Sequence, residues 1–159
     1  MTETATEIRS VVVEREVPFP PEKVWRALTQ PHLIEEWLMK NDFSPVAGAH
    51  FSFLADWGSV DGEVRDVQPN RTLSYTWDAL GLESVVTWTL TPTSGGTRLR
   101  MEQAGFRPDQ EQAYQGAQYG WRRFFAALSD HAVAPGSLCR QKRRVGPPEH
   151  RVQFLLLGP

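Results

Sequence analysis

Few residues in this 159-residue chain have the types and spacing that catalysis requires. Its four histidines form no HExxH arrangement and have no second soft ligand nearby, which argues against a metal site. They are His32, His50, His131 and His150. The sequence also lacks a GxSxG elbow, a P-loop and a dinucleotide GxGxxG motif, so the commonest serine-nucleophile and nucleotide-dependent enzymes are disfavoured. We therefore expect no metal and no cofactor.

Two groups of polar residues are candidates for chemistry inside a cavity. The first contains acids that could act as a general base, namely Asp56, Glu63, Asp78 and Glu83. Such acids on strand edges and in loops are more often solvated, and we favour that interpretation. The second group is Tyr75, Gln103 and Tyr114, which strand alternation and helical phase place on inward faces. A satisfied core position is the commoner role for a buried tyrosine.

The elements that position these residues follow from the periodicity of the apolar residues. A β-branched run predicts a strand over residues 8–17, and prolines then delimit a helix before Pro31 and a short helix over 32–38. Alternating residues separated by tight turns predict an antiparallel sheet. Its strands are expected near 49–55, 59–67, 72–78, 84–91 and 97–105. A helix with one apolar face should run from Pro108 to about Ser129.

Alternation places most of the bulky rings on one shared face. The chain has 6 Trp, 8 Phe and 3 Tyr, more aromatic residues than a core of this size requires. The inward set comprises Phe51, Phe53, Tyr75, Trp77, Trp88, Met101 and Gln103 from the strands, and Tyr114, Trp121 and Phe125 from the last helix. The pattern allows two interpretations, a plain hydrophobic core or the walls of a ligand cavity.

Composition and charge exclude several classes of protein. A net charge of -2 and a pI near 6.1 disfavour nucleic-acid binding. A lone cysteine, Cys139, cannot form an internal disulfide and fits a reducing compartment. Residues 1–10 are polar, and no apolar run is long enough to span a bilayer. We expect a cytoplasmic protein with no signal peptide and no membrane span.

The C-terminal residues 134–159 differ in composition from the rest. Five basic residues and one acid lie between Arg140 and Arg151, leaving 12 basic and 18 acidic residues elsewhere. Prolines and a glycine interrupt this stretch, so no long helix is expected. We interpret residues 1–133 as one domain and 134–159 as a basic tail. A solvated extension is favoured over a dedicated contact with anionic surfaces.

Several short motifs follow one another in a fixed order along the chain. The opening motif PPEKVWRALTQP spans residues 20–31 and is followed by Trp37. Later motifs are LSYTW at 73–77, WTL at 88–90, GTRL at 96–99, GF at 105–106 and GW at 120–121. Their order and spacing make the set specific. Together, over about residues 8–130, they resemble the helix-grip, START-like (SRPBCC) superfamily, and within it the heat shock protein 90 ATPase activator homologue branch.

The resemblance implies an α+β helix-grip (START-like) fold. In that fold a curved antiparallel six-stranded sheet wraps around a long C-terminal helix, with two short helices after the first strand. An apolar cavity often lies between sheet and helix. The superfamily includes carriers, cyclases, sequestering proteins and chaperone regulators, and this branch has no shared catalytic constellation, so the fold alone does not select a function.

Our leading hypothesis is non-enzymatic binding of a hydrophobic small molecule, such as a lipid, a polyketide or an aromatic compound. The inward set defined above would line the cavity. One alternative is a stress-response interaction module similar to the chaperone ATPase activators, which would use the outer sheet face with Arg98, Arg100 and Glu102. A polyketide cyclase or aromatase is a second alternative, and it needs an acid or base that the sequence does not single out.

Overall fold

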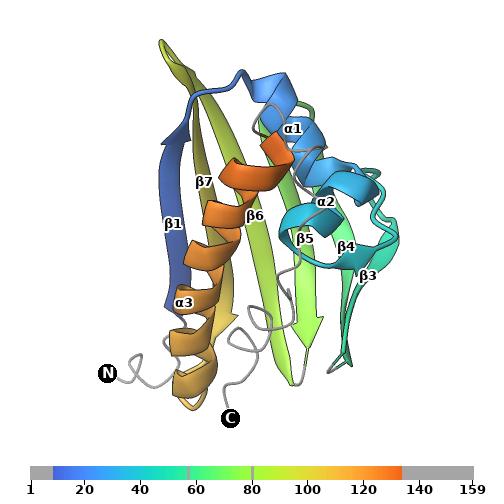
Figure 1. Cartoon of the computed structure of the whole chain (residues 1–159). Coiled ribbons are helices and arrows are strands. Elements are labelled where there is room, and N and C mark those ends of the chain that lie inside the picture. The colour runs from blue at the N-terminus through green and yellow to red at the C-terminus, as the bar shows by residue number, and fades with distance from the viewer. Residues whose placement is uncertain (1–8, 57, 80, 134–159) are drawn as a thin grey trace.

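The computed structural model of the chain describes residues 9–56, 58–79 and 81–133 (Figure 1). The predicted basic tail and its boundary at residue 134 lie outside the described residues. The elements in chain order are β1 (Arg9–Val17), α1 (Pro21–Thr29), α2 (Pro31–Trp37), β2 (Lys40–Asn41), β3 (His50–Ala55), β4 (Gly58–Gln68), β5 (Thr72–Ala79), β6 (Leu82–Thr93), β7 (Gly96–Phe106) and α3 (Glu111–Ala127), which continues as a π-helical segment over Leu128–Val133.

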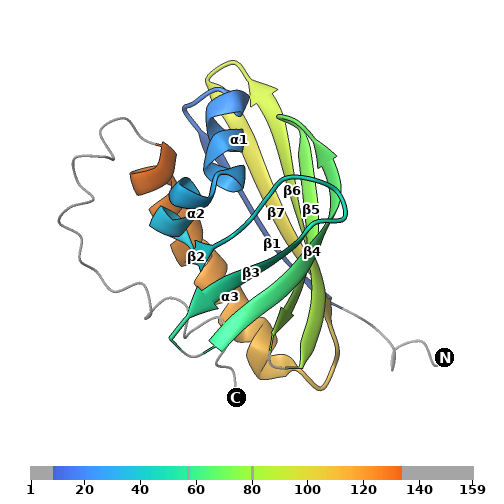
Figure 2. The same ribbon diagram turned by 90° about the vertical axis from the view of Figure 1, so that its right-hand side faces the viewer.

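The strands form one antiparallel sheet in the order β1-β7-β6-β5-β4-β3-β2. All three helices lie on the same side of this sheet, which we call its inner face (Figure 2). The arrangement confirms the helix-grip fold, with one correction to the strand count. The sheet has seven strands rather than six, because the two-residue β2 pairs with β3 through Lys40 and Leu54, and through Asn41 and Phe53. Two residues are too few for an alternating pattern to reveal.

Two prolines set the limits of the short helices. Pro21 and Pro31 occupy the first turns of α1 and α2, where a missing backbone N–H is not needed for the helix. Pro31 cannot continue α1, so α1 ends at Thr29 and α2 begins at Pro31. The indole Nε1 of Trp37 then donates a hydrogen bond to the carbonyl of Ala27, 2.9 Å away, which joins the two helices inside the core. No helix in the described part of the chain is both long and apolar enough to cross a membrane.

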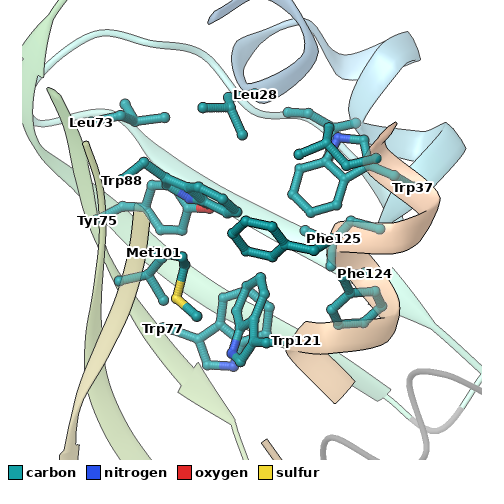
Figure 3. Close-up of a cluster of buried hydrophobic side chains, with 14 of the residues drawn as sticks. Leu28, Trp37, Leu73, Tyr75, Trp77, Trp88, Met101, Trp121, Phe124 and Phe125 are labelled. Carbon is teal, nitrogen blue, oxygen red and sulfur yellow. The ribbon is translucent and has the colours of Figure 1, made fainter. Parts of the chain in front are cut away.

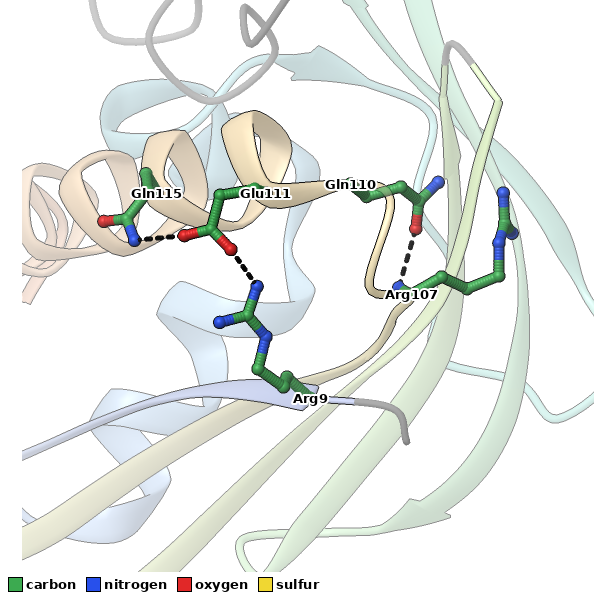
Figure 4. Close-up of polar contacts among 5 residues, drawn as sticks. All are labelled: Arg9, Arg107, Gln110, Glu111 and Gln115. Atoms are coloured by element: carbon green, nitrogen blue, oxygen red, sulfur yellow. Dashed lines mark hydrogen bonds and ion pairs between the residues drawn. The ribbon is translucent and has the colours of Figure 1, made fainter. Parts of the chain in front are cut away.

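The start of α3 is tied to the first strand (Figure 4). The guanidinium of Arg9 on β1 donates to the carboxylate of Glu111, which also accepts a 2.8 Å hydrogen bond from Gln115 one turn further along α3. The side chain of Gln110 accepts a 2.9 Å hydrogen bond from the backbone N–H of Arg107. These contacts fix the direction in which α3 leaves β7 and crosses the inner face. The acid in the first turn also favours the helix dipole.

Gly62 on β4 leaves room for the Phe51 ring of β3 and for the backbone of Thr76 on β5. Gly62 is paired directly with Phe51, whose ring lies over it. A Cβ at position 62 would stand 2.2 Å from the backbone oxygen of Thr76 and 2.5 Å from the Phe51 ring. The backbone oxygen cannot move aside without disturbing the sheet, so this position has no room for any side chain.

Gly62→Ala should therefore lower the free energy of unfolding by about 3 kcal/mol, at the upper end of the cost of overpacking a core. Urea denaturation followed by circular dichroism measures the change. Gly95→Ala is the matched control, because its Cβ would meet only the tip of Glu16, 3.9 Å away. We expect the control to stay within about 0.5 kcal/mol of the parent. Equal effects at both positions would contradict the close-packing argument.

Candidate functional site

Nine of the ten side chains predicted to line a cavity lie in the core on the inner face. Figure 3 labels Tyr75, Trp77, Trp88, Met101, Trp121 and Phe125 among them. All nine are buried, and they come from strands β3, β5, β6 and β7 and from helix α3. Their rings and three further ones form a continuous set of ring contacts, which we call the aromatic cluster. Its members are Phe51, Phe53, Tyr75, Trp77, Trp88, Trp121 and Phe125, together with Trp37, Phe43 and Phe124. Met101 and Gln103 lie beside it on β7, fully buried.

Trp121 connects the helix to the sheet within the aromatic cluster. Its ring centroid lies 5.3 Å from that of Trp77 and 5.8 Å from that of Trp88, and it also contacts Phe124 on its own helix at 5.4 Å. Phe125, the neighbouring residue of α3, stacks on Trp88 at 5.6 Å. Edge-on and offset stacked geometries of this kind are the ones that aromatic quadrupoles favour. In the described arrangement, ring–ring contacts join the helix directly to the sheet.

Tyr75 supplies a polar atom in the middle of the aromatic cluster. Its hydroxyl oxygen accepts a 3.0 Å hydrogen bond from Nε1 of Trp88. Burial raises the pKa of Tyr75 far above its ordinary value, and the hydrogen bond from Trp88 offsets only part of that rise. The hydroxyl therefore stays protonated across the physiological range, so it can orient a ligand by hydrogen bonding but cannot act as an anionic base.

A second set of polar atoms forms a hydrogen-bonded chain beside Trp121 and Trp77. Nε1 of Trp121 donates to Oε1 of Gln103 at 2.7 Å, and Nε2 of Gln103 donates to Oγ of Ser84 at 2.9 Å. The Ser84 hydroxyl donates in turn to the backbone oxygen of Trp77 at 2.9 Å. This chain satisfies the fully buried Gln103 amide and fixes the orientation of the Trp121 indole.

One buried donor in the aromatic cluster has no partner. Nε1 of Trp77 is inaccessible to solvent, and the described residues offer it no acceptor within hydrogen-bond distance. Leaving such a donor unsatisfied costs about 1 to 3 kcal/mol.

Tyr114 is the predicted residue that the structure sets apart from the others. It is half-buried at the start of α3, where its ring meets Phe106 edge-on at 5.5 Å. The guanidinium of Arg9 lies over the Tyr114 ring in a cation–π contact, 3.9 Å from the ring centroid. Tyr114 thus belongs to the contact between β1 and α3 that also contains Glu111.

Sequence reasoning missed two residues that complete the site. Phe43 packs against Phe51 and Tyr75, with centroids 5.0 and 5.4 Å apart, but it lies between β2 and β3, where no periodicity marks it. Ser84 precedes Val86 and Trp88 on the inward side of β6, so the alternation of that strand could have identified it.

A separate hollow opens on the outer face of the sheet, and Phe51 of the aromatic cluster is among its lining residues. Its volume is about 430 Å³, and its lining is mostly polar. The lining residues are Asp42, His50, Phe51, Ser52, Asp61, Gly62, Glu63, Arg65, Thr76 and Asp78. Two of the acids named from the sequence, Glu63 and Asp78, are therefore grouped here, whereas exposed Asp56 and Glu83 do not line it. No group of three or more His, Cys, Asp or Glu side chains that could hold a metal ion occurs within residues 9–56, 58–79 and 81–133.

The carboxylate of Asp78 is destabilised in this hollow. Partial removal from water raises the pKa of Asp78, and the negative charges of Glu83 and Asp61 raise it further, while Arg65 opposes them. Asp78 lies directly across from Asp61 on β4 and from Glu83 on β6, so three like charges stand in one row. The hollow thus has an excess of negative charge and would favour cations over anions.

Comparisons with known sequences and structures point to one family. Residues 18–132 match the family described as Activator of Hsp90 ATPase homolog 1-like protein. The crystal structure of protein MLL2253 from Mesorhizobium loti is 62% identical, covering 76% of this chain and 94% of that one, with a TM-score of 0.75. The solution structure of protein BH1534 from Bacillus halodurans is 25% identical over 81% and 99% of the two chains, with a TM-score of 0.73.

DynU16, a protein in the dynemicin biosynthetic locus, is also similar. Its crystal structure is 28% identical, covering 76% of this chain, with a TM-score of 0.69. The match covers 45% of DynU16, so the similarity extends over less than half of that longer chain. A search of curated protein sequences finds no significant match.

The row of like charges at Asp78 predicts a pH dependence of stability. Because the pKa of Asp78 is raised on folding, its proton stabilises the folded state at low pH, and this contribution is lost as the pH rises through the folded pKa. Asp78→Asn should therefore be more stable than the parent at pH 7, and the difference should shrink at pH 4. Urea denaturation at both pH values measures it.

Glu111→Gln is the control with the opposite sign. Hydrogen bonds from Gln115 and Arg9 lower the pKa of Glu111, so its ionised form stabilises the fold above the unfolded pKa. This variant should be less stable than the parent at pH 7, and the deficit should shrink as the pH falls. An Asp78→Asn variant that lost stability at pH 7 would contradict the repulsion described above.

Proposed function

The chain belongs to the Activator of Hsp90 ATPase homolog 1-like family, and on that premise we propose that it binds an apolar small molecule between the sheet and α3. The observation that supports this function is the composition of the inner face. Ligand pockets are lined by apolar and aromatic side chains with a few well-placed polar groups. The aromatic cluster has that composition, since its rings surround only the Tyr75 hydroxyl, the Gln103 amide and the indole N–H groups.

The close contacts within the aromatic cluster define how a ligand would bind. Trp121 and Phe125 touch the rings of β5 and β6 directly, so a ligand must replace some ring–ring contacts with contacts of its own. A flat apolar or aromatic molecule restores the same kind of contact, which offsets part of the free energy lost with the displaced ring–ring contacts. A charged ligand would lose its hydration with no ion pair in return. This selects for uncharged aromatic or acyl compounds.

The relatives support a small-molecule function. DynU16 lies in a biosynthetic locus, and it shares this fold at 28% identity. We place the ligand-binding residues of this chain at Phe51, Phe53, Tyr75, Trp77, Trp88, Met101, Gln103, Trp121 and Phe125, with Tyr114 at the edge of the site. The role is one of carriage or sequestration, since the only titratable group in the aromatic cluster, Tyr75, is held in its neutral form.

A paired measurement on Trp121 tests this function. The parent should bind the uncharged fluorescent probe N-phenyl-1-naphthylamine saturably, and an organic extract of the purified protein should yield an apolar compound by mass spectrometry. Trp121→Ala should lose probe binding and also lower the free energy of unfolding by about 3 to 5 kcal/mol, because a fully buried ring is removed. Tyr119→Ala, on the exposed side of the same helix, is the control and should retain probe binding.

The outcomes separate a ligand site from an ordinary core. A parent protein that binds no probe and releases no compound would contradict the proposed function, and the loss of stability in Trp121→Ala would then reflect an ordinary hydrophobic core. Probe binding that persists in Trp121→Ala would place the site elsewhere.

A second candidate function, as a chaperone-binding module, is supported by the family and by the outer face of β7. Arg98 is exposed there, and Arg100 and Glu102 form a 3.3 Å ion pair beside it. If this face binds a chaperone, reversing both positive charges with Arg98→Glu and Arg100→Glu should abolish co-purification of the chaperone while the circular dichroism spectrum is unchanged. Binding that survives the reversal would exclude this surface.

A further inference from the structure

Four buried indole groups differ in whether their N–H has a hydrogen-bond acceptor. Trp37, Trp77, Trp88 and Trp121 are each no more than 1% exposed. The indole of Trp37 donates to a backbone carbonyl, that of Trp88 to Tyr75, and that of Trp121 to Gln103, at distances of 2.7 to 3.0 Å. Trp77 alone among them has no acceptor in the described part of the chain. Because buried N–H groups are almost always paired, this exception requires an explanation.

The polar groups near Trp77 are already engaged. Its ring contacts Trp121 and Phe53, at 5.3 and 5.5 Å between centroids, and neither side chain offers an acceptor. The oxygen of Gln103 accepts from Trp121, and the Ser84 hydroxyl donates to the backbone of Trp77 itself. Reassigning either group would leave another buried donor unpaired.

Trp77 meets α3 through the ring of Trp121 (Figure 3). One and two turns before Trp121, α3 carries Ala117 and Ala113, which are small residues of the same helix face. A ligand that extends along this face from Trp121 would contact their methyl groups, while the unpaired N–H of Trp77 lies on the sheet side of Trp121.

We propose that the ligand carries a carbonyl oxygen that accepts a hydrogen bond from Nε1 of Trp77. This inference rests on the proposed function and names the ligand class as an uncharged aromatic ketone or quinone. A carbonyl is an acceptor only, so it satisfies the indole and adds no donor of its own. A hydroxyl would bring a second buried donor into a place where the described acceptors are engaged. A carboxylate would bury a charge with no cation beside it.

The test uses two rigid probes of nearly the same shape, fluorenone and fluorene, which differ by a carbonyl in place of a methylene group. Isothermal titration should show that the parent binds fluorenone more tightly than fluorene. Trp77→Phe keeps an aromatic ring but removes the N–H, and should weaken fluorenone binding about five- to tenfold, the range of one hydrogen bond, while fluorene binding changes less than about twofold. Trp25→Phe on α1 is the matched control, because Trp25 lies outside the aromatic cluster, and it should leave the ratio of the two affinities unchanged.

An independent readout on the parent protein covers the case in which Trp77→Phe does not fold. In a proton–nitrogen correlation spectrum of the parent, one of the six indole N–H signals should move downfield with fluorenone and not with fluorene. If fluorenone and fluorene bind equally well, or Trp77→Phe weakens both alike, or no indole signal distinguishes them, the carbonyl inference is overturned and the proposed function stands, with a buried water as the partner of Trp77. If neither probe binds, the proposed function itself is overturned and the inference with it.

Discussion

The packing of Trp121 between Trp77 and Trp88 is the interaction on which the rest of the structure depends. A sheet with one apolar face is stable only when another layer covers that face, and in this chain α3 is the long element that does so. Trp121 places the largest ring of the helix against rings of two strands, and its hydrogen bond to Gln103 fixes its orientation. The position of α3, and with it the size and shape of any space on the inner face, therefore follows from this one side chain.

The sheet that Trp121 packs against has two chemically different faces. Within the aromatic cluster and the Gln103–Ser84 chain the side-chain polar atoms are neutral and, apart from Nε1 of Trp77, paired in the described structure. On the outer face the carboxylates of Asp61, Asp78 and Glu83 stand in a row across three strands, and their mutual repulsion is moderated by water and by Arg65. Successive side chains of a strand point to opposite faces of the sheet, so each side chain lies in one of these two environments.

Sequence reasoning predicted the strands and the inner face because both follow from local rules. Alternation with a period of two identified Trp77 and Trp88 as inward residues, and prolines marked the limits of α1 and α2. The features that it missed depend on contacts between distant segments. Phe43 joins the aromatic cluster from an irregular segment, and β2 is too short to have a pattern. Helical phase predicted that Tyr114 faces inward. Its ring instead lies at the edge of the sheet, where it contacts the guanidinium of Arg9, about a hundred positions away in the chain.

The order of the strands along the chain has a consequence for synthesis on the ribosome. Strands β3 to β7 form a meander in which each strand pairs with the next, so hairpins close as soon as their residues are available. The first strand is different, because Val17 pairs with Thr97 and its partner strand is made much later. The covering helix is later still, since chains emerge from the amino end. Strands β1 to β7 can therefore pair before α3 has emerged to cover them, and during that interval only α1 and α2 shield the aromatic face, which leaves its rings open to contact with other chains.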